Sequence, residues 1–406
     1  MSRGRFGARL AVVARWLVLG MAAAGLSGCL EGQPRNGIPQ DFKYIPQVSG
    51  YPLDIRIWGD TLASFPRERL IQLRQQRVMA AKADPSINLS EINALTLSGG
   101  GSSGAFGAGI LTGWTQTGTR PRFDVVTGIS TGALIAPFAF LGPEYDDELT
   151  EAFTTVSDKD IYERISIGDI ISTAAFTSNE PLRKMLDKYI TDDVIDQVAV
   201  EYGKGRRLLI GTTNLDAGRP VIWNMGAIAA SGRPDRAQLF KDVILASTAI
   251  PGVFPPSHMK VSANGKSYEE MHVDGGVTTE VFLMPPGLSL RSLGKKYDLN
   301  MKSTLYVIRN GRTTPEFKIV NPTLIAIAGK SISSLIDTQA IGDLYRLYAI
   351  AKRDGIDYNV IDIPTTFTAE AKSPFDNAFM RSLYDTGYQM GVNGIPWKKA
   401  PPGFSS

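Results

Sequence analysis

A run of glycines directly after a short apolar segment is the feature that most limits how this 406-residue chain can fold. Residues 92–97 have the composition of a buried strand, and residues 99–101 are all glycine, followed after two serines by Gly104. An apolar helical pattern then begins, over residues 105–114. Glycine adopts the backbone angles of tight turns without strain, so this segment predicts a strand that turns straight into a helix, the repeating unit of α/β folds.

Short apolar segments continue to alternate with longer helical patterns along the chain. Strands are expected over 123–127, 207–213, 269–273, 303–309 and 357–363, with helices from 133 onward and over 242–247, 322–353 and 376–390. Strands that are separated by helical crossovers pair in parallel. The sequence therefore predicts an α/β protein with a mainly parallel central sheet and helices on both faces.

The first 28 residues have the pattern of an export signal. Four arginines precede an apolar stretch over residues 16–26 that is too short to span a bilayer comfortably. Leu26-Ser-Gly-Cys29 resembles the bacterial lipobox, in which the cysteine is lipidated and becomes the mature N-terminus. Leu30, not Asp, follows, which favours the outer membrane in the sorting rules for such lipoproteins. We expect an exported, lipid-anchored bacterial protein; the alternative is an ordinary signal peptide with a chance cysteine.

Composition excludes several kinds of chemistry. The four leader arginines account for more than the net charge of +3, and the rest of the chain, at −1, has no basic run of the kind that binds nucleic acid. A single cysteine permits no intramolecular disulfide and no cysteine-based metal site. Only two histidines occur, His258 and His272, so a three-histidine zinc site is impossible. We expect no metal, no cofactor and no nucleic-acid partner.

The glycine-rich segment allows three interpretations. Gly99, Gly101 and Gly104 satisfy the G-x-G-x-x-G pattern of dinucleotide-binding folds, with Asp124 about 20 residues further on. That acid belongs at the end of the second strand, however, and Asp124 stands at the start of one. A second interpretation is a turn that only allows close packing. The third is a loop whose bare backbone amides bind an anion.

The pattern G-x-S-x-G occurs twice, around Ser102 and around Ser130. A nucleophilic serine needs a sharp strand-to-helix turn with glycines on either side, so that its hydroxyl is exposed without a clash. Gly128-Ile-Ser130-Thr-Gly132 lies between an apolar strand and an apolar helix, whereas Ser102 lies within the glycine run. Ser130 is therefore the nucleophile candidate, with Gly128 and Gly132 as its elbow, and the glycine run is the candidate oxyanion hole.

A serine nucleophile needs a base. Asp274 is the candidate, because Asp274-Gly-Gly follows a short strand and the glycines leave its carboxylate accessible at the strand end. An Asp-Gly-Gly sequence by itself mostly marks a turn. His272 lies two residues earlier on the same side of the strand, so a Ser-His-acid triad is a second possibility.

In this order, Gly-Gly-Gly-x-x-Gly, Gly-x-Ser-x-Gly and a later Asp-Gly-Gly resemble the patatin-like phospholipases, as does the block over residues 246–256. The resemblance covers residues 92–310 and implies a patatin-like variant of the α/β hydrolases with a Ser–Asp dyad. It implies that Ser130 attacks, that Asp274 is the base and that amides of the glycine run hold the oxyanion. Ser103 departs from the family, which has Arg or Lys at that position. The oxyanion-hole candidates are Gly99, Gly100, Gly101 and Gly104.

The resemblance implies a serine acyl hydrolase that acts on phospholipids or lysophospholipids, with membrane lipids as both substrate and anchor. The alternatives are a Ser-His-Asp esterase and a non-catalytic, lipid-anchored binding or scaffold protein. The expected segments are a signal peptide (1–28), the lipidated Cys29 with an extended tether (29–60), a helical extension packed on the core or lying on a membrane surface (61–91), the catalytic domain (92–310) and a part that completes or covers it (311–406).

Overall fold

The computed structural model describes residues 35–39, 44–61, 68–85, 87–164, 177–284, 289, 291–292, 301–315, 317 and 319–404. The expected signal peptide and Cys29 lie outside these residues. Within the described ranges, no helix combines the length and the apolar character that a membrane crossing requires.

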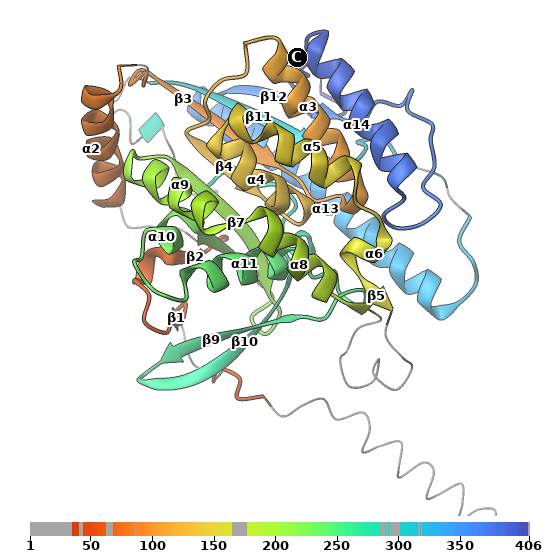
Figure 1. Ribbon diagram of the computed structural model, residues 1–406, viewed down its shortest axis with the longest axis horizontal. Coiled ribbons are helices and arrows are strands. Elements are labelled where there is room, and N and C mark those ends of the chain that lie inside the picture. The colour runs from red at the N-terminus through yellow and green to blue at the C-terminus, as the bar shows by residue number, and fades with distance from the viewer. Residues whose placement is uncertain are drawn as a thin grey trace, which may run out of the picture.

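A ten-stranded sheet forms the centre of the molecule (Figure 1). Its strands are β1 (Gln47–Val48), β2 (Arg56–Trp58), β3 (Glu91–Leu97), β4 (Val125–Gly128), β7 (Arg207–Asn214), β8 (Arg219–Asn224), β9 (Ser257–Ala263), β10 (Lys266–Asp274), β11 (Lys302–Arg309) and β12 (Asp357–Asp362). The order is β1-β9-β10-β7-β4-β3-β11-β12, and β8 pairs with both β7 and β2. A separate pair is formed by β5 (Glu163–Arg164) and β6 (Thr177–Ser178).

The sheet is parallel from β7 through β4, β3 and β11 to β12, as predicted. The strands beyond β7 are antiparallel, which the prediction of a mainly parallel sheet did not include. For β9 and β10 the reason is local, because they are joined by Asn264 and Gly265, both with positive φ (50° and 74°). An Asn-Gly pair in this conformation makes the two-residue turn that matches the twist of a β-hairpin.

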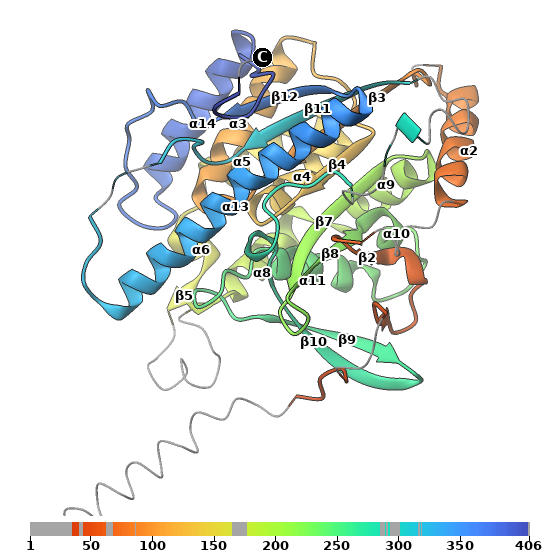
Figure 2. The same cartoon turned by 180° about the vertical axis from the view of Figure 1, so that it is seen from behind.

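Helices cover both faces of the sheet, which confirms that part of the prediction (Figures 1 and 2). The long helix α13 (Leu324–Asp354) lies on the face shown in Figure 2. Its Leu344 and Leu347 pack on Leu305 and Val307 of β11. The remaining helices are α2 (Glu68–Ala83), α3 (Gly104–Gln116), α4 (Thr131–Leu141), α5 (Asp146–Thr154), α6 (Asp158–Ile161), α8 (Glu180–Tyr189), α9 (Asp192–Gly203), α10 (Met225–Ala229), α11 (Arg236–Ser247) and α14 (Asn377–Val392).

Glycines let α3 and α14 pack backbone to backbone. A methyl group on Gly109 would lie 2.1 Å from the carbonyl oxygen of Tyr384, and one on Gly387 would lie 2.3 Å from that of Phe106. Gly113 and Gly391, one turn further along each helix, are equally close to the opposite backbone. In the C-terminal part of the chain, β12 thus extends the central sheet and α14 lies against α3.

Residues 47–58, which the sequence assigned to an extended tether, instead belong to the fold. β1 pairs with β9, and β2 pairs with β8. Between them Tyr51 is buried and its hydroxyl donates to Asp235 at 2.9 Å. Arg56 forms a buried ion pair with Glu270 at 2.5 Å. These partners lie about 200 residues away in sequence, so the composition of the segment could not indicate them.

Candidate active site

Ser130 occupies a strained turn between β4 and α4. Its φ is 52° and its ψ is −124°, a backbone conformation that residues other than glycine rarely adopt. The elbow glycines make the turn possible, because a methyl group on Gly128 would lie 2.4 Å from the carbonyl oxygen of Gly132. One on Gly132 would lie 2.4 Å from that of Leu97. This geometry is that of a nucleophile elbow.

Ser247, at the end of α11, holds the backbone of this turn. Its hydroxyl accepts a hydrogen bond from the amide of Ser130 at 3.0 Å and donates one to the carbonyl of Gly211 at 2.7 Å. All three groups are buried. Ser247 lies in the 246–256 block that resembles the family, but its contact with Ser130 was not predicted.

Asp274 meets Ser130 from β10. Its side chain is 2% exposed, and its Oδ1 accepts a hydrogen bond from the amide of Gly276 at 2.8 Å. Burial raises the pKa of Asp274 to about 6, against the opposing effect of hydrogen bonds from the Ser130 side chain and the Gly276 amide. At neutral pH the carboxylate is therefore mostly ionised, and it already contacts the candidate nucleophile.

The glycine loop contributes fewer free amides than the sequence suggested. The amide of Gly99 donates to Glu280 Oε2 at 2.8 Å, and that of Gly104 donates to the carbonyls of Gly101 and Ser102. The amides of Gly100 and Gly101 have no acceptor among the described residues. Of the four predicted oxyanion-hole residues, Gly100 and Gly101 thus keep amides available, whereas those of Gly99 and Gly104 are already occupied.

Gly104 serves packing instead. A methyl group there would lie 2.2 Å from Thr131 Oγ1 and 2.8 Å from Phe153, so only glycine lets α3 begin against the first turn of α4. Gly100 has a φ of 152°, and a methyl group on it would lie 1.9 Å from the carbonyl oxygen of Asn310. Both positions thus bring the loop into close contact with its neighbours.

Two residues at the end of β11 hold the loop in place, and nothing in the sequence indicated their role. Asn310 donates from Nδ2 to the carbonyl of Ser98 at 2.9 Å and accepts the amide of Gly107 at 3.0 Å. Arg309 donates to the carbonyl of Gly99 at 3.3 Å. Ser103 stands at the position where the resemblance led us to expect Arg or Lys, and in this structure a buried guanidinium approaches the loop from another strand.

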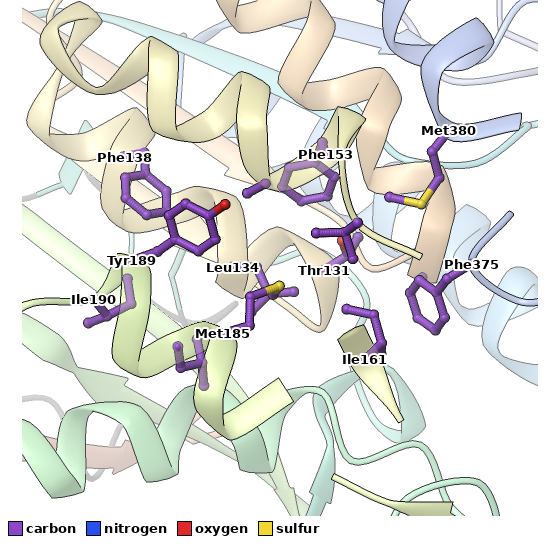
Figure 3. Close-up of a pocket in the computed structure, with 14 residues that line it drawn as sticks. Thr131, Leu134, Phe138, Phe153, Ile161, Met185, Tyr189, Ile190, Phe375 and Met380 are labelled. Atoms are coloured by element: carbon purple, nitrogen blue, oxygen red, sulfur yellow. The ribbon is translucent and has the colours of Figure 1, made fainter. Parts of the chain in front are cut away.

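An apolar pocket adjoins the turn and the loop (Figure 3). Gly101 and Thr131, the neighbour of Ser130, lie at its wall. Its other lining residues are Leu134, Phe138, Ala152, Phe153, Val156, Ile161, Met185, Leu186, Tyr189, Ile190, Phe375 and Met380. The pocket thus places an apolar surface next to the candidate nucleophile.

Neither histidine lies at Ser130. His272 is fully buried, with Nδ1 at 2.9 Å from Thr212 Oγ1 and Nε2 at 3.0 Å from Glu270. Burial lowers the pKa of His272. His258 is partly exposed and pairs with Glu269. Both ring nitrogens of His272 are thus engaged in a structural network, which disfavours the triad.

Two further sequence features have structural roles. Asp124 pairs with Arg77 of α2 and accepts the amide of Asn93 at 2.9 Å, so it fastens α2 to the sheet and is not placed as a ribose-binding acid. Among the described residues, no group of three or more His, Cys, Asp or Glu side chains could hold a metal ion.

Glu280 is a second buried carboxyl group in the site, and sequence reasoning did not identify it. Its side chain is 2% exposed, and burial, which is the largest cause, raises its pKa to about 8. Its signal in the sequence is weak, because a glutamate six residues after Asp274 reads as a surface charge.

A sequence model of the family described as patatin-like phospholipase matches residues 95–285. VipD from Legionella pneumophila is similar in structure at 13% identity and a TM-score of 0.32, covering 88% of this chain and 72% of that one. ExoU from Pseudomonas aeruginosa, solved with SpcU, is similar at 14% identity and a TM-score of 0.27, covering 75% of this chain and 52% of that one. Human GIVD cytosolic phospholipase A2 is similar at 10% identity and a TM-score of 0.31, covering 77% of this chain and 55% of that one.

This chain therefore spans about half the length of the last two solved proteins. No curated protein matches the chain in sequence.

Proposed function

We propose that the protein cleaves a carboxylic ester of a phospholipid or lysophospholipid with a Ser130–Asp274 dyad. The proposal builds on the match of residues 95–285 to the patatin-like phospholipases, a family of lipid hydrolases. One observation carries the proposal: the strained Ser130 turn lies next to the buried carboxylate of Asp274, the free loop amides and an apolar pocket.

In the first half-reaction Asp274 takes the proton of the Ser130 hydroxyl as Oγ attacks the ester carbonyl carbon. The carbonyl oxygen becomes an oxyanion, which the amides of Gly100 and Gly101 stabilise. A single such donor is worth about 2.7–4 kcal/mol in measured oxyanion holes. When the intermediate collapses, the bond to the leaving alcohol breaks, and the alcohol takes the proton from Asp274.

In the second half-reaction water cleaves the acyl-enzyme. Asp274 removes a proton from the water as its oxygen attacks the acyl carbon, and the same two amides again hold the oxyanion. The Ser130 Oγ leaves and is reprotonated by Asp274, which releases the fatty acid and restores the dyad. None of these steps needs a histidine.

The pocket next to Thr131 would bind the acyl chain. Its lining is almost entirely apolar, and each methylene transferred from water to such a surface contributes about 0.8 kcal/mol. This contribution supports long-chain esters over short ones as substrates.

We propose that the first turns of α13 contact the lipid surface. Asp337 of α13 pairs with Arg309 at 2.8 Å, and towards its N-terminus the helix extends beyond the end of β11 (Figure 2). Leu324 and Leu335 on this projecting part are 84% and 71% exposed. Lys330 is the one charged residue between them. Exposed apolar clusters of this kind mark interaction surfaces.

Replacing both leucines by serine tests that contact. We expect weaker binding to phospholipid vesicles and slower hydrolysis of vesicle lipid, with unchanged hydrolysis of a soluble short-chain ester. Leu53→Ser, an equally exposed leucine on η1 (Leu53–Ile55), is the matched control. Unchanged vesicle binding in the double variant would refute this part of the proposal.

We also propose that lipidation at Cys29 anchors the exported protein in the outer membrane, in keeping with the leader sequence. Cys29→Ala should move the protein from the membrane fraction to the soluble fraction. An unchanged distribution would instead support an ordinary signal peptide.

The central experiment compares the wild type with Ser130→Ala and Asp274→Asn on a panel of phospholipids, lysophospholipids and soluble esters. We expect fatty-acid release by the wild type alone, and labelling of Ser130 by a fluorophosphonate. A wild type with neither activity nor labelling would support the non-catalytic alternative. Loss of activity in His272→Ala with correct folding, but not in Asp274→Asn, would support the triad.

A further inference from the structure

Glu280 is a buried carboxyl group that the dyad mechanism does not use. It follows Asp274 by six residues, just after the turn η5 (Gly275–Val277). An unpaired ionised carboxylate is costly in such a site, and the nearest cation, Arg309 Nη1, is 3.7 Å from Oε2. The question is therefore what keeps a glutamate at this position.

The carboxyl group of Glu280 lies against the glycine loop, close to the nucleophile turn. Its Oε2 accepts the amide of Gly99 at 2.8 Å. A methyl group on Gly99 would lie 2.9 Å from both carboxyl oxygens and 3.0 Å from Ser130 Cβ. The carboxyl group and the nucleophile thus face the same Cα atom, one residue before the free amides of Gly100 and Gly101.

The other carboxyl oxygen faces the base. A methyl group on Gly276 would lie 2.4 Å from Glu280 Oε1 and 3.2 Å from Asp274 Oδ1. The Glu280 backbone is fixed as well, because its amide donates to Asp343 of α13 at 2.7 Å. Glu280 is thus anchored on α13 and faces the glycine loop and the turn after Asp274, with Ser130 also close to Gly99.

We propose that Glu280 is a positioning residue that in its neutral form holds the glycine loop against the dyad, and whose ionisation slows ester cleavage. The inference rests on the proposed hydrolase function. Because Oε2 accepts the Gly99 amide, the proton of the neutral form belongs on Oε1, the oxygen that faces Gly276 in the turn after Asp274. Neutral Glu280 therefore orders the loop without placing a second negative charge beside the developing oxyanion.

The surrounding charges favour this neutral form. Asp274 faces Glu280 from β10, Asp343 from α13 and Arg309 from the end of β11. The single cation is shared, because Arg309 also pairs with Asp337 at 2.8 Å. Burial and the two aspartates together outweigh Arg309 and the Gly99 amide, which agrees with a pKa of Glu280 of about 8.

The test compares pH–rate profiles of the wild type, Glu280→Gln and Glu280→Ala on a soluble ester, with kcat and KM measured separately. The wild-type kcat should fall above about pH 8, tenfold per pH unit if one group controls it. Glu280→Gln keeps an acceptor for Gly99 but cannot ionise, so its kcat should be near the wild-type maximum without the alkaline fall. Glu280→Ala should lose about tenfold to a hundredfold in kcat at every pH, with little change in KM.

Glu370→Gln, an exposed glutamate, is the control and should follow the wild-type profile. A wild-type profile that stays flat through the alkaline range, or the same fall in Glu280→Gln, would overturn the proposal. A structural role alone would lower the activity of Glu280→Ala but would not remove the alkaline limb in Glu280→Gln.

Infrared difference spectroscopy gives a readout that needs no turnover. A protonated carboxyl band should titrate near pH 8 in the wild type and in Ser130→Ala, and it should be missing in Glu280→Gln. If the wild type shows this band but hydrolyses no ester, the proposed function fails while the protonation of Glu280 stands. If the protein hydrolyses esters and the band is missing, the Glu280 proposal alone is refuted.

Discussion

Ser247→Ala tests whether the strained turn at Ser130 depends on a single hydroxyl group. The substitution removes the acceptor of the Ser130 amide, at 3.0 Å, and the donor to the Gly211 carbonyl, at 2.7 Å. Both backbone groups are buried, so neither gains full hydration in the variant. The change leaves the volume of the core nearly unaltered, which makes hydrogen bonding the main quantity that differs.

The expected magnitude follows from these two groups. Leaving a buried polar group unsatisfied costs about 1–3 kcal/mol. We expect the free energy of unfolding to fall by about 2–4 kcal/mol, since some water can enter. With a urea dependence of about 3 kcal/mol per molar for a chain of this size, the unfolding midpoint should shift by roughly 1 M.

Activity should fall further than stability explains. The conformation of Ser130, with φ at 52°, costs on the order of 1–3 kcal/mol and persists only while its surroundings hold it. Without the Ser247 acceptor the turn can relax and misalign Oγ, so kcat should drop about tenfold to a hundredfold under conditions where the variant remains folded.

The assay combines urea unfolding with ester hydrolysis well below the unfolding midpoint. Ser382→Ala, which makes the same chemical change on an exposed face of α14, is the matched control and should leave both quantities unchanged. If Ser247→Ala unfolds at the wild-type midpoint and keeps its kcat, then the hydrogen bonds of Ser247 do not maintain the elbow.

Three other predictions concern packing, chain length and pH. Gly387→Ala should destabilise the protein by about 1–3 kcal/mol in urea unfolding by forcing α14 off α3, whereas Gly329→Ala, which meets no atom within 4 Å, should not. Met185→Trp should fill the pocket and shift the preference towards shorter acyl chains, by about fourfold in kcat/KM for each methylene excluded; an unchanged chain-length profile would argue against this pocket. Because Asp274 must be ionised and its pKa is about 6, kcat/KM should fall as pH decreases through about 6, and a profile flat to about pH 5 would exclude it as the base.

The positions of Ser130 and Asp274 could be predicted from sequence because their motifs are local. Gly128 and Gly132 indicate a sharp turn independently of the rest of the chain. The neighbouring parallel strands place that turn at the carboxyl edge of the sheet. The α/β architecture follows from the same alternation of strands and helices. The hairpin of β9 and β10 was also visible in principle, because Asn264-Gly265 is a strong turn signal.

The oxyanion loop shows where a local pattern stops being informative. All four glycines fit the pattern equally well, yet the amide of Gly99 is occupied by Glu280 and that of Gly104 by its own turn. Which amides remain free depends on acceptors contributed by other segments. No spacing rule within residues 99–104 contains that information.

The sequence by itself determined the alternation of strands and helices in the parallel part of the sheet, the sharp turn at Ser130 and the placement of Asp274 at the end of a strand, because these follow from backbone preferences of neighbouring residues. Only the tertiary structure decided which groups surround them. Ser247 and Glu280 reach the Ser130 turn and its glycine loop from more than 100 residues away, and each becomes important because it is buried against a polar group that needs a partner. Burial and partnership belong to the folded chain, and they turned ordinary residues into parts of the site.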